Sequence, residues 1–202
     1  MKAAARAALG FRSHSGWAAL VVVAGSPGDP VIIERRRVQI ADPRIGGSLQ
    51  PYHAAKEMEF ADAEAFINRC GAATQRMAQK AVGEVVAELA GKGYTAAGAC
   101  VLLGSGRLAT GLAATLRSHP MIHTAEGDFF RDAIKTACDA CGLPVIGVKE
   151  KELIRHAAAV LGVTLDHLQV RAAELGKGLG PPWRQDEKLS AIAGWLALRD
   201  LR

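Results

Sequence analysis

The sequence predicts an α/β fold: a mixed five-stranded sheet flanked by helices, with extra helices at its C-terminal end. Three strand-like segments joined by short turns come first, and this order is typical of a β-meander. Helical and strand-like segments then alternate, which indicates parallel strands joined by crossover helices. The 202 residues fit one domain, and we expect residues 151–202 to form its helical C-terminal part.

The first three strands are expected at residues 5–11, 17–24 and 31–40. The second of them, WAALVVVA, is rich in β-branched residues and has the composition of a buried strand. Side chains alternate between the two faces of a strand, so the third segment should present two sets. The first set is Ile33, Arg35 and Arg37, and the second is Ile32, Glu34, Arg36 and Val38.

Hydrophobic periodicity predicts the remaining elements. Apolar and small residues at helical spacing favour a long helix over residues 52–89, which we expect to break near Gly71. The fourth and fifth strands are expected at residues 96–103 and 143–148. The other helices are expected at residues 118–141, 151–161, 165–176 and 186–198, with Ser118 and Thr164 as N-caps.

Composition narrows the class of protein. A formal net charge of +5 and a pI near 9.2 suit a phosphate-rich partner, and they also suit an ordinary basic protein. Cys138 and Cys141 have the spacing of a redox pair, but they end a predicted helix, whereas thioredoxin-like pairs begin one. The first residues lack the apolar core of a signal peptide, and no apolar run reaches membrane-spanning length. We therefore expect a cytoplasmic protein without a membrane partner.

His119, His123 and Glu126 are the leading candidates for chemistry. On a helix, this spacing places the three side chains within roughly 60° of one another. Two imidazoles and a carboxylate on one face could bind a divalent metal such as Mg²⁺, Mn²⁺ or Zn²⁺, with a further ligand from His14 or His53. Without a metal, a histidine could act as a general base that Glu126 orients. Local hydrogen bonds at the start of a helix are the structural alternative.

The turn after the first strand is a second candidate site. An arginine, short hydroxyls and backbone amides can form an anion cradle, so we assign phosphate binding to Arg12 and Ser13. His14 in the same turn is a candidate for acid–base chemistry. The alternative is an ordinary polar hairpin turn in which Gly16 supplies the unusual backbone angle.

Two further segments supply candidate ligand-binding residues. Ser105 and Arg107 follow the fourth predicted strand, and ligands in α/β sheets usually bind at the carboxyl ends of parallel strands. His53 follows a glycine-rich loop, where functional residues often lie, but it could instead help to cap the helix that begins there.

Two other charged segments, at residues 186–187 and 35–37, each allow a functional and a structural interpretation. Asp186 and Glu187 are tentative metal ligands together with Glu126, yet carboxylates at this position also stabilise the positive end of a helix dipole. The three consecutive arginines at residues 35–37 suit nucleic-acid contact or a solvated strand. Interleaved aromatic residues, which would support base stacking, are missing from this run.

The order of elements and three segments resemble the ribonuclease-H-like superfamily, in particular its Holliday-junction-resolvase branch. LGFRSHSGWAALVVV is similar to the first hairpin of that superfamily, GLPVIGV to its fifth strand and DEKLSAIAGWLAL to its closing helix. The topological resemblance covers nearly the whole chain. It implies a phosphodiester substrate and two divalent metals, held by carboxylates on the first strand, near the end of the fourth strand and on the closing helix.

The sequence departs from that metal-binding pattern. Asp186 and Glu187 remain on the closing helix, but the other acidic positions have changed. Those positions now hold Phe11 or Arg12, Gly104 or Ser105, and Ser190. The resemblance therefore implies the fold but not the usual set of metal ligands.

We expect a protein that engages nucleic acid or another phosphate-bearing ligand. It could be a divergent phosphodiester hydrolase, in which a histidine or a single metal activates water. A non-catalytic binding or scaffold protein on the same fold, or a small-molecule enzyme that uses the His/Glu cluster, are the alternatives. One site should gather Arg12, His14, Ser105, His119, His123, Glu126 and Asp186 at the ends of the first and fourth strands.

Overall fold

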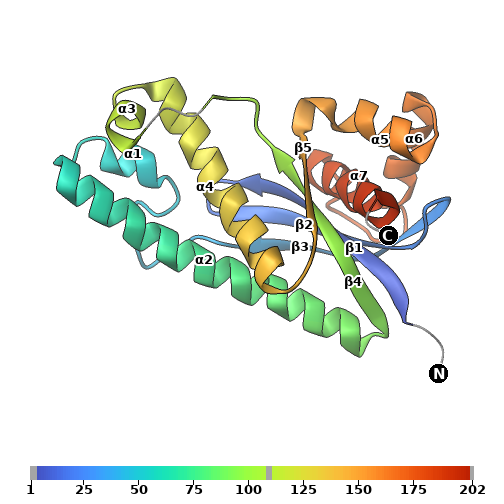
Figure 1. Cartoon of the computed structure of the whole chain (residues 1–202). Helices are drawn as coiled ribbons and strands as arrows, with labels where there is room; N and C mark the ends of the chain where they lie inside the picture. The colour runs from blue at the N-terminus through green and yellow to red at the C-terminus, as the bar shows by residue number, and fades with distance from the viewer. Residues whose placement is uncertain (1–3, 108–110, 201–202) are drawn as a thin grey trace.

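The computed structural model describes residues 4–107 and 111–200, and within them helices cover both faces of one sheet (Figure 1). The strands are β1 (Ala5–His14), β2 (Trp17–Ser26), β3 (Asp29–Gln39), β4 (Tyr94–Leu103) and β5 (Val145–Lys149). The longer helices are α2 (Phe60–Gly91), α4 (His119–Ala140), α5 (Leu153–Leu161), α6 (Leu165–Glu174) and α7 (Gln185–Asp200). The short ones are α1 (Pro51–Ala55), α3 (Leu112–Leu116) and the 3-10 helix η1 (Glu150–Glu152).

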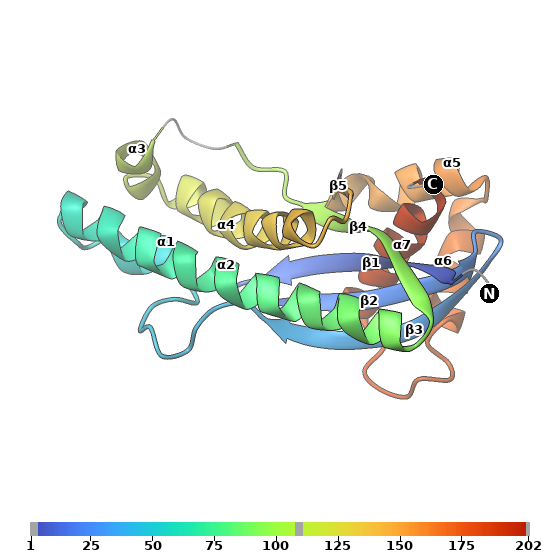
Figure 2. The ribbon, with the colours of Figure 1, turned by 60° about the horizontal axis from the view of Figure 1, so that its bottom comes forward.

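The strands form one mixed sheet in the order β3-β2-β1-β4-β5. β2 pairs antiparallel with both β1 and β3, so the chain begins with the predicted meander. β4 pairs parallel with β1 and with β5, after crossovers that contain α2 and α4 (Figure 2). The predicted fold class is confirmed. Because β1, β4 and β5 run in the same direction, their carboxyl ends lie at one end of the sheet.

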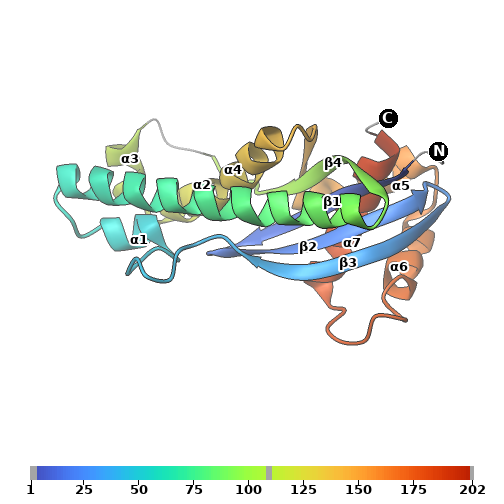
Figure 3. The same ribbon diagram turned by 90° about the horizontal axis from the view of Figure 1, so that it is seen from below.

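The helices divide between the two faces of the sheet (Figure 3). α2 and α4 cover one face, where Leu9, Leu20 and Phe130 belong to the same core cluster. α5, α6 and α7 cover the other face. α7 lies close to β1, because a Cβ added to Gly10 would stand 1.8 Å from the carbonyl oxygen of Ser190. A glycine at this point allows backbone-to-backbone approach and brings the start of α7 beside the end of β1.

The predicted long helix is broken at a different place from the expected one. Residues 56–59 separate α1 from α2, and α2 continues through Gly71 without interruption. Turn hydrogen bonds from the amides of Lys56 and Met58 to carbonyls within α1 end the first helix. The short helix α3 was not predicted. Thr164 caps α6 as predicted, with its hydroxyl accepting a hydrogen bond from the amide of His167.

A β-bulge changes which residues of β3 share a face. The register between β2 and β3 shifts at one point, where Ile33 is the extra residue. Ile32 therefore packs on the α7 side, the side of Arg35 and Arg37, whereas Ile33 packs on the α2 side with Arg36. The predicted alternation is right for the arginines. It is wrong for the two isoleucines, because one inserted residue moves a side chain to the opposite face.

Two further expectations concern redox chemistry and membranes. Cys138 is buried, and burial is the main cause that raises the pKa of its thiol to about 12. A thiol that stays protonated is a poor redox nucleophile. Within the described ranges, no helix combines the length and apolar character needed to cross a membrane.

Candidate functional site

Several of the predicted site residues fall into two groups, the first of which also includes a residue that was not predicted, Glu150. The first group, which we call the Arg12 cluster, lies at the ends of β1 and β5 and the start of α7, and comprises Arg12, His14, Glu150 and Asp186. The second group, the histidine cluster, comprises His53 of α1 with His119 and His123 of α4. Among the residues that the structure describes, no hydrogen bond or ion pair joins the two groups. The hydrogen bonds and ring contacts of these residues therefore define two clusters and not one.

Arg12 is the centre of the first cluster. Its Nε donates to Oε2 of Glu150 at 3.0 Å and its Nη2 donates to Oε1 at 2.7 Å, which makes a bidentate ion pair. Its Nη1 donates to Oδ1 of Asp186, and Nε2 of His14 lies 3.0 Å from the same oxygen. The Arg12 side chain is 18% exposed. One largely buried guanidinium thus connects two carboxylates that come from distant parts of the chain.

The charges of the Arg12 cluster stabilise one another. The hydrogen bond with Glu150 is the largest effect on the pKa of Arg12 and raises it; burial opposes this shift and Asp186 adds to it. Desolvation acts to raise the pKa of Asp186, but hydrogen bonds and charge from Arg12 and His14 outweigh it, and the pKa is lowered. Arg12 and Asp186 therefore both remain charged at neutral pH.

The residues at this end of the sheet do not fit the two-metal centre that the family resemblance implies. Arg12 brings a positive charge and only hydrogen-bond donors, and it occupies an oxygen of Asp186 that a metal would need. The end of β4 continues into Gly104 and Ser105, which offer no carboxylate. We therefore derive no metal chemistry at the Arg12 cluster.

Two other residues of α7 have structural partners. The carboxylate of Glu187 accepts a hydrogen bond from the amide of Arg184 at 2.7 Å, so it caps the start of its own helix. Ser190 is fully buried, and its hydroxyl donates to the carbonyl of Ala19 at 3.1 Å. Glu187 thus has a capping role within α7, and Ser190 helps to hold α7 against the sheet.

Trp17 extends the Arg12 cluster across the sheet. Its ring stacks on that of His14, with 4.2 Å between the centroids and 10° between the planes. The guanidinium carbon of Arg37 lies 3.9 Å from the centre of the Trp17 ring, in a cation–π contact. Because β2 lies between β1 and β3, His14 and Arg37 approach Trp17 from opposite sides. No aromatic residue is interleaved with the arginines along β3, but the fold places Trp17 of β2 against Arg37.

A cavity of about 440 Å³ lies between β3 and the start of α7, beside this stack. Its lining includes Trp17, two carboxylates and four arginines: Asp186, Glu187, Arg35, Arg36, Arg37 and Arg184. Arg35 donates to backbone carbonyls of residues 179–182 and holds that linker against the sheet. Arg37 and Arg184 are exposed. In the described part of the chain, neither of their guanidinium groups has a carboxylate partner.

The histidine cluster combines three imidazoles from two helices. His119 and His123 stand one turn apart on α4, with 4.4 Å between their ring centroids. The ring of His53 lies 5.5 Å from that of His119 and 4.8 Å from that of His123. One ring nitrogen from each histidine lies within 4.8 Å of the corresponding nitrogen of the others. Of the two candidate additional ligands, His53 approaches this face of α4, whereas His14 belongs to the Arg12 cluster.

Glu126 is a buried carboxylate that contacts His53 of the histidine cluster. Its side chain is buried, its Oε1 accepts a hydrogen bond from the amide of Tyr52 at 2.9 Å, and its Oε2 contacts Nδ1 of His53. Burial, followed by the negative charge of Glu126, raises the pKa of Tyr52. Glu126 thus fixes the orientation of His53 and is not one of the three converging side chains. It was predicted as both a catalytic residue and a metal ligand.

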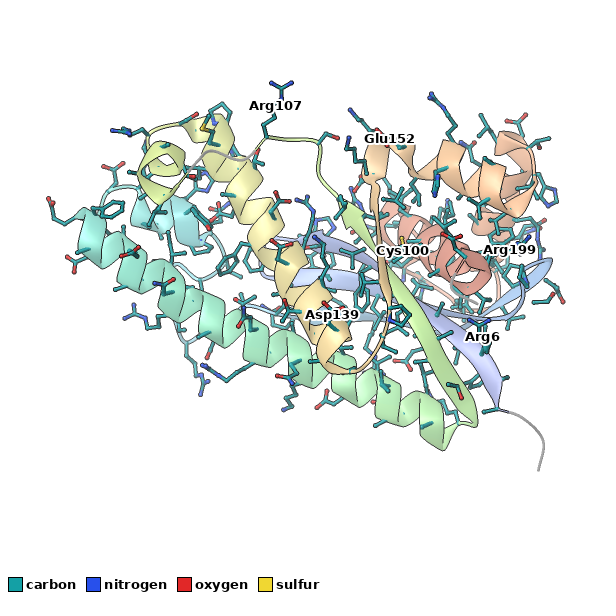
Figure 4. All side chains as sticks on the ribbon, in the orientation of Figure 1. Arg6, Cys100, Arg107, Asp139, Glu152 and Arg199 are labelled. Carbon is teal, nitrogen blue, oxygen red and sulfur yellow. The ribbon has the colours of Figure 1, made fainter. Side chains whose placement is uncertain are left out.

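Three predicted phosphate ligands stand outside both clusters. Ser13 faces the opposite side of β1 from Arg12 and His14, because successive side chains of a strand alternate. Ser105 and Arg107 are exposed in the segment after β4, and Figure 4 shows Arg107 pointing away from the rest of the molecule. Phosphate binding by these residues stays a prediction.

Sequence reasoning missed Glu150 and Trp17. Glu150 directly follows β5, and an acidic residue at the carboxyl end of a parallel strand is a usable signal. Trp17 is the cross-strand partner of His14 around a two-residue turn, so a hairpin register would have paired them. Both signals require the strands to be placed beside each other before the residues are interpreted.

No protein-family model matches the chain, and comparison with curated proteins finds no relative. Solved structures are similar in fold. RuvC from Thermus thermophilus in complex with a Holliday junction substrate matches with a TM-score of 0.52 at 13% identity, over 95% of this chain and 91% of that chain. A second structure of Thermus thermophilus RuvC gives a TM-score of 0.53 at 13% identity, over 94% and 92% of the two chains. The protein therefore has a divergent ribonuclease-H-like fold of the resolvase type.

Proposed function

We propose that this protein binds nucleic acid, and that the arginine-lined cavity beside the Arg12 cluster is part of the binding surface. The proposal does not include two-metal hydrolysis at the ends of β1 and β4, because Phe11 and Arg12 offer no carboxylate at the strand-one position that the resemblance implies, and Arg12 pairs with Asp186. RuvC, which shares the fold, was solved with a Holliday junction substrate. Branched DNA is therefore the first ligand to test.

The contact between Arg37 and Trp17 is the observation that carries the proposal. The guanidinium of Arg37 is exposed, yet the indole 3.9 Å away limits its motion. A side chain that is already ordered loses less entropy when it binds a ligand. While one face of the guanidinium rests on the indole, its edge can still donate hydrogen bonds to a phosphate.

Arg184 and the overall charge support the same interpretation. Arg184 lines the same cavity from the other side and is exposed, so the two arginines can contact one phosphate backbone together. The formal net charge of +5 adds a general attraction for a polyanion. This kind of binding is independent of base sequence and weakens steeply as salt is added.

A binding titration tests the proposal. Fluorescence anisotropy would be measured with a labelled four-way DNA junction, a matched duplex and a single strand, each over a series of salt concentrations. We expect salt-dependent binding by the wild type. The Arg37→Ala/Arg184→Ala variant should bind more weakly, with a slope of log K against log salt that is smaller by about 2, since two phosphate contacts are lost.

Arg69→Ala/Arg76→Ala is the matched control. Both arginines are exposed on α2 and neither lines the arginine-lined cavity, so the control removes the same charge elsewhere. If the wild type binds none of the three nucleic acids, the proposed function is wrong. Equal losses in the two double variants would show general charge attraction and contradict the proposed surface.

A further inference from the structure

We propose that His53, His119 and His123 form a binding site for a divalent transition metal, with Zn²⁺ as the preferred ion. The inference is independent of nucleic-acid binding, since it depends on residues of α1 and α4 and not on the Arg12 cluster. It also differs from the metal chemistry that the fold implies, which uses carboxylates at the ends of β1 and β4.

The geometry of the three imidazoles suits one shared ion. Their candidate ligand nitrogens all lie within 4.8 Å of one another. Nitrogens bound to a single zinc at about 2.0–2.1 Å stand roughly 3.4 Å apart, so modest ring rotations close the remaining gap. His119 and His123 are exposed, and rings at the surface are free to make such rotations.

Glu126 supplies the second part of the argument. Zinc-binding histidines commonly donate their other ring N–H to a carboxylate, which fixes the ring and makes the free nitrogen a better ligand. The buried carboxylate of Glu126 occupies that position on Nδ1 of His53, and the amide of Tyr52 holds its other oxygen at 2.9 Å. The Nε2 of His53 is thereby left as the nitrogen available for a metal.

The helix that carries His53 is itself held in place. The ring of Tyr52, the preceding residue, packs edge-on against Phe129 of α4, with 6.0 Å between the centroids. This ring packing, together with Glu126, fixes His53 of α1 relative to His119 and His123 of α4. A site built on two docked helices needs little reorganisation when an ion binds.

The nature of the ligands selects the class of metal. Imidazole nitrogens suit zinc, copper, nickel and cobalt, whereas magnesium and calcium prefer oxygen ligands. Three protein ligands leave at least one coordination position for water or for an oxygen of a phosphate or carboxylate. His53 also lines a cavity of about 660 Å³ that reaches Ser15 and the loop before α1. A metal here would therefore be accessible to a small anionic ligand.

Titration of metal into untagged protein tests the site. Calorimetry with Zn²⁺ should show one equivalent bound to the wild type, and Co²⁺ should develop the strong visible absorption of a tetrahedral nitrogen site. The His119→Ala/His123→Ala variant should lose both signals. The matched control is His156→Ala/His167→Ala, which removes two exposed histidines from α5 and α6 and should keep both signals.

Glu126→Gln tests the supporting role without removing a ligand. We expect its Zn²⁺ affinity to fall by about 10- to 100-fold, as is typical when the partner of a metal-bound histidine is changed. Far-UV circular dichroism in EDTA would establish that each variant is folded. Absence of Zn²⁺ binding by the wild type would overturn the proposal, and so would unchanged binding by His119→Ala/His123→Ala. Unchanged affinity in folded Glu126→Gln would contradict the role of Glu126.

Discussion

The Arg12 cluster and the histidine cluster differ in what balances their charge. In the first, a guanidinium lies between the carboxylates of Glu150 and Asp186, so the positive charge is part of the chain. In the second, three imidazoles converge near one buried carboxylate, Glu126, and the proposed positive charge comes from a metal in solution. The comparison teaches that one fold can supply a positive charge from its own side chain at one place and offer candidate metal ligands at another.

The two clusters should therefore respond differently to the same treatment. The Arg12 cluster holds its cation covalently, so chelators should not affect its stability. The histidine cluster should gain stability whenever a metal binds, because an ion that binds the native state alone shifts the unfolding equilibrium. Each prediction below changes the charge balance of one cluster.

The largest effect is expected when Arg12 is replaced by an acid. Arg12→Asp removes the shared partner of Glu150 and Asp186 and places a third carboxylate beside them. We expect the free energy of unfolding to fall by about 2–4 kcal/mol, somewhat less than for a fully buried ion pair, since Glu150 and Asp186 are 39% and 27% exposed. Urea unfolding followed by circular dichroism measures this loss.

Mn²⁺ sharpens this test. Three carboxylates without a guanidinium resemble an oxygen-rich metal site, so saturating Mn²⁺ should restore about 2–3 kcal/mol to Arg12→Asp. Arg12→Ala is the control: it should be destabilised less and recover less with Mn²⁺. An Arg12→Asp protein as stable as the wild type would show that the guanidinium does not hold this end of the sheet together.

Local patterns account for the parts of the fold that the sequence predicts well. The strand at residues 17–24 follows from its β-branched composition, and the helix that contains His119 and His123 follows from side-chain period. The bulge at Ile33 does not, because an inserted residue depends on how β2 and β3 pair. The break between α1 and α2 likewise depends on where α1 docks against α4.

The candidate sites divide in the same way. The relation between His119 and His123 was predictable because both lie on one helix face, one turn apart. Arg12 and Glu150 are 138 residues apart in sequence, and no local pattern connects them. His53 could be named as a possible partner, but only the packing of α1 against α4 brings it to the other histidines. Sequence spacing can therefore predict which residues share one face of a helix or strand. Which helices and strands lie beside each other depends on tertiary packing.

A smaller effect is expected from truncating the buried acid of the histidine cluster. Glu126→Ala leaves the amide of Tyr52 and Nδ1 of His53 without their partner in a buried position. We expect the free energy of unfolding in EDTA to fall by about 2 kcal/mol, the cost of an unsatisfied buried donor. Glu126→Gln retains an acceptor for the amide and should lose about half as much. Equal losses in the two variants would contradict a hydrogen-bonding role and indicate packing alone.

The smallest effect is the pH dependence that Asp186 contributes. The pKa of Asp186 is lowered in the folded protein, so its charged form stabilises the fold at pH values above the ordinary aspartate pKa of about 3.9. That contribution is lost as pH falls through the lower pKa of the folded state. Asp186→Asn should therefore be less stable than the wild type at pH 7, by roughly 1 kcal/mol as for a partly exposed ion pair.

Urea unfolding curves of both proteins at a series of pH values should show this difference in stability beginning to close below about pH 4. A gap that stays constant down to pH 2 would mean that Asp186 acts through its shape and not its charge, and that Glu150 alone balances Arg12.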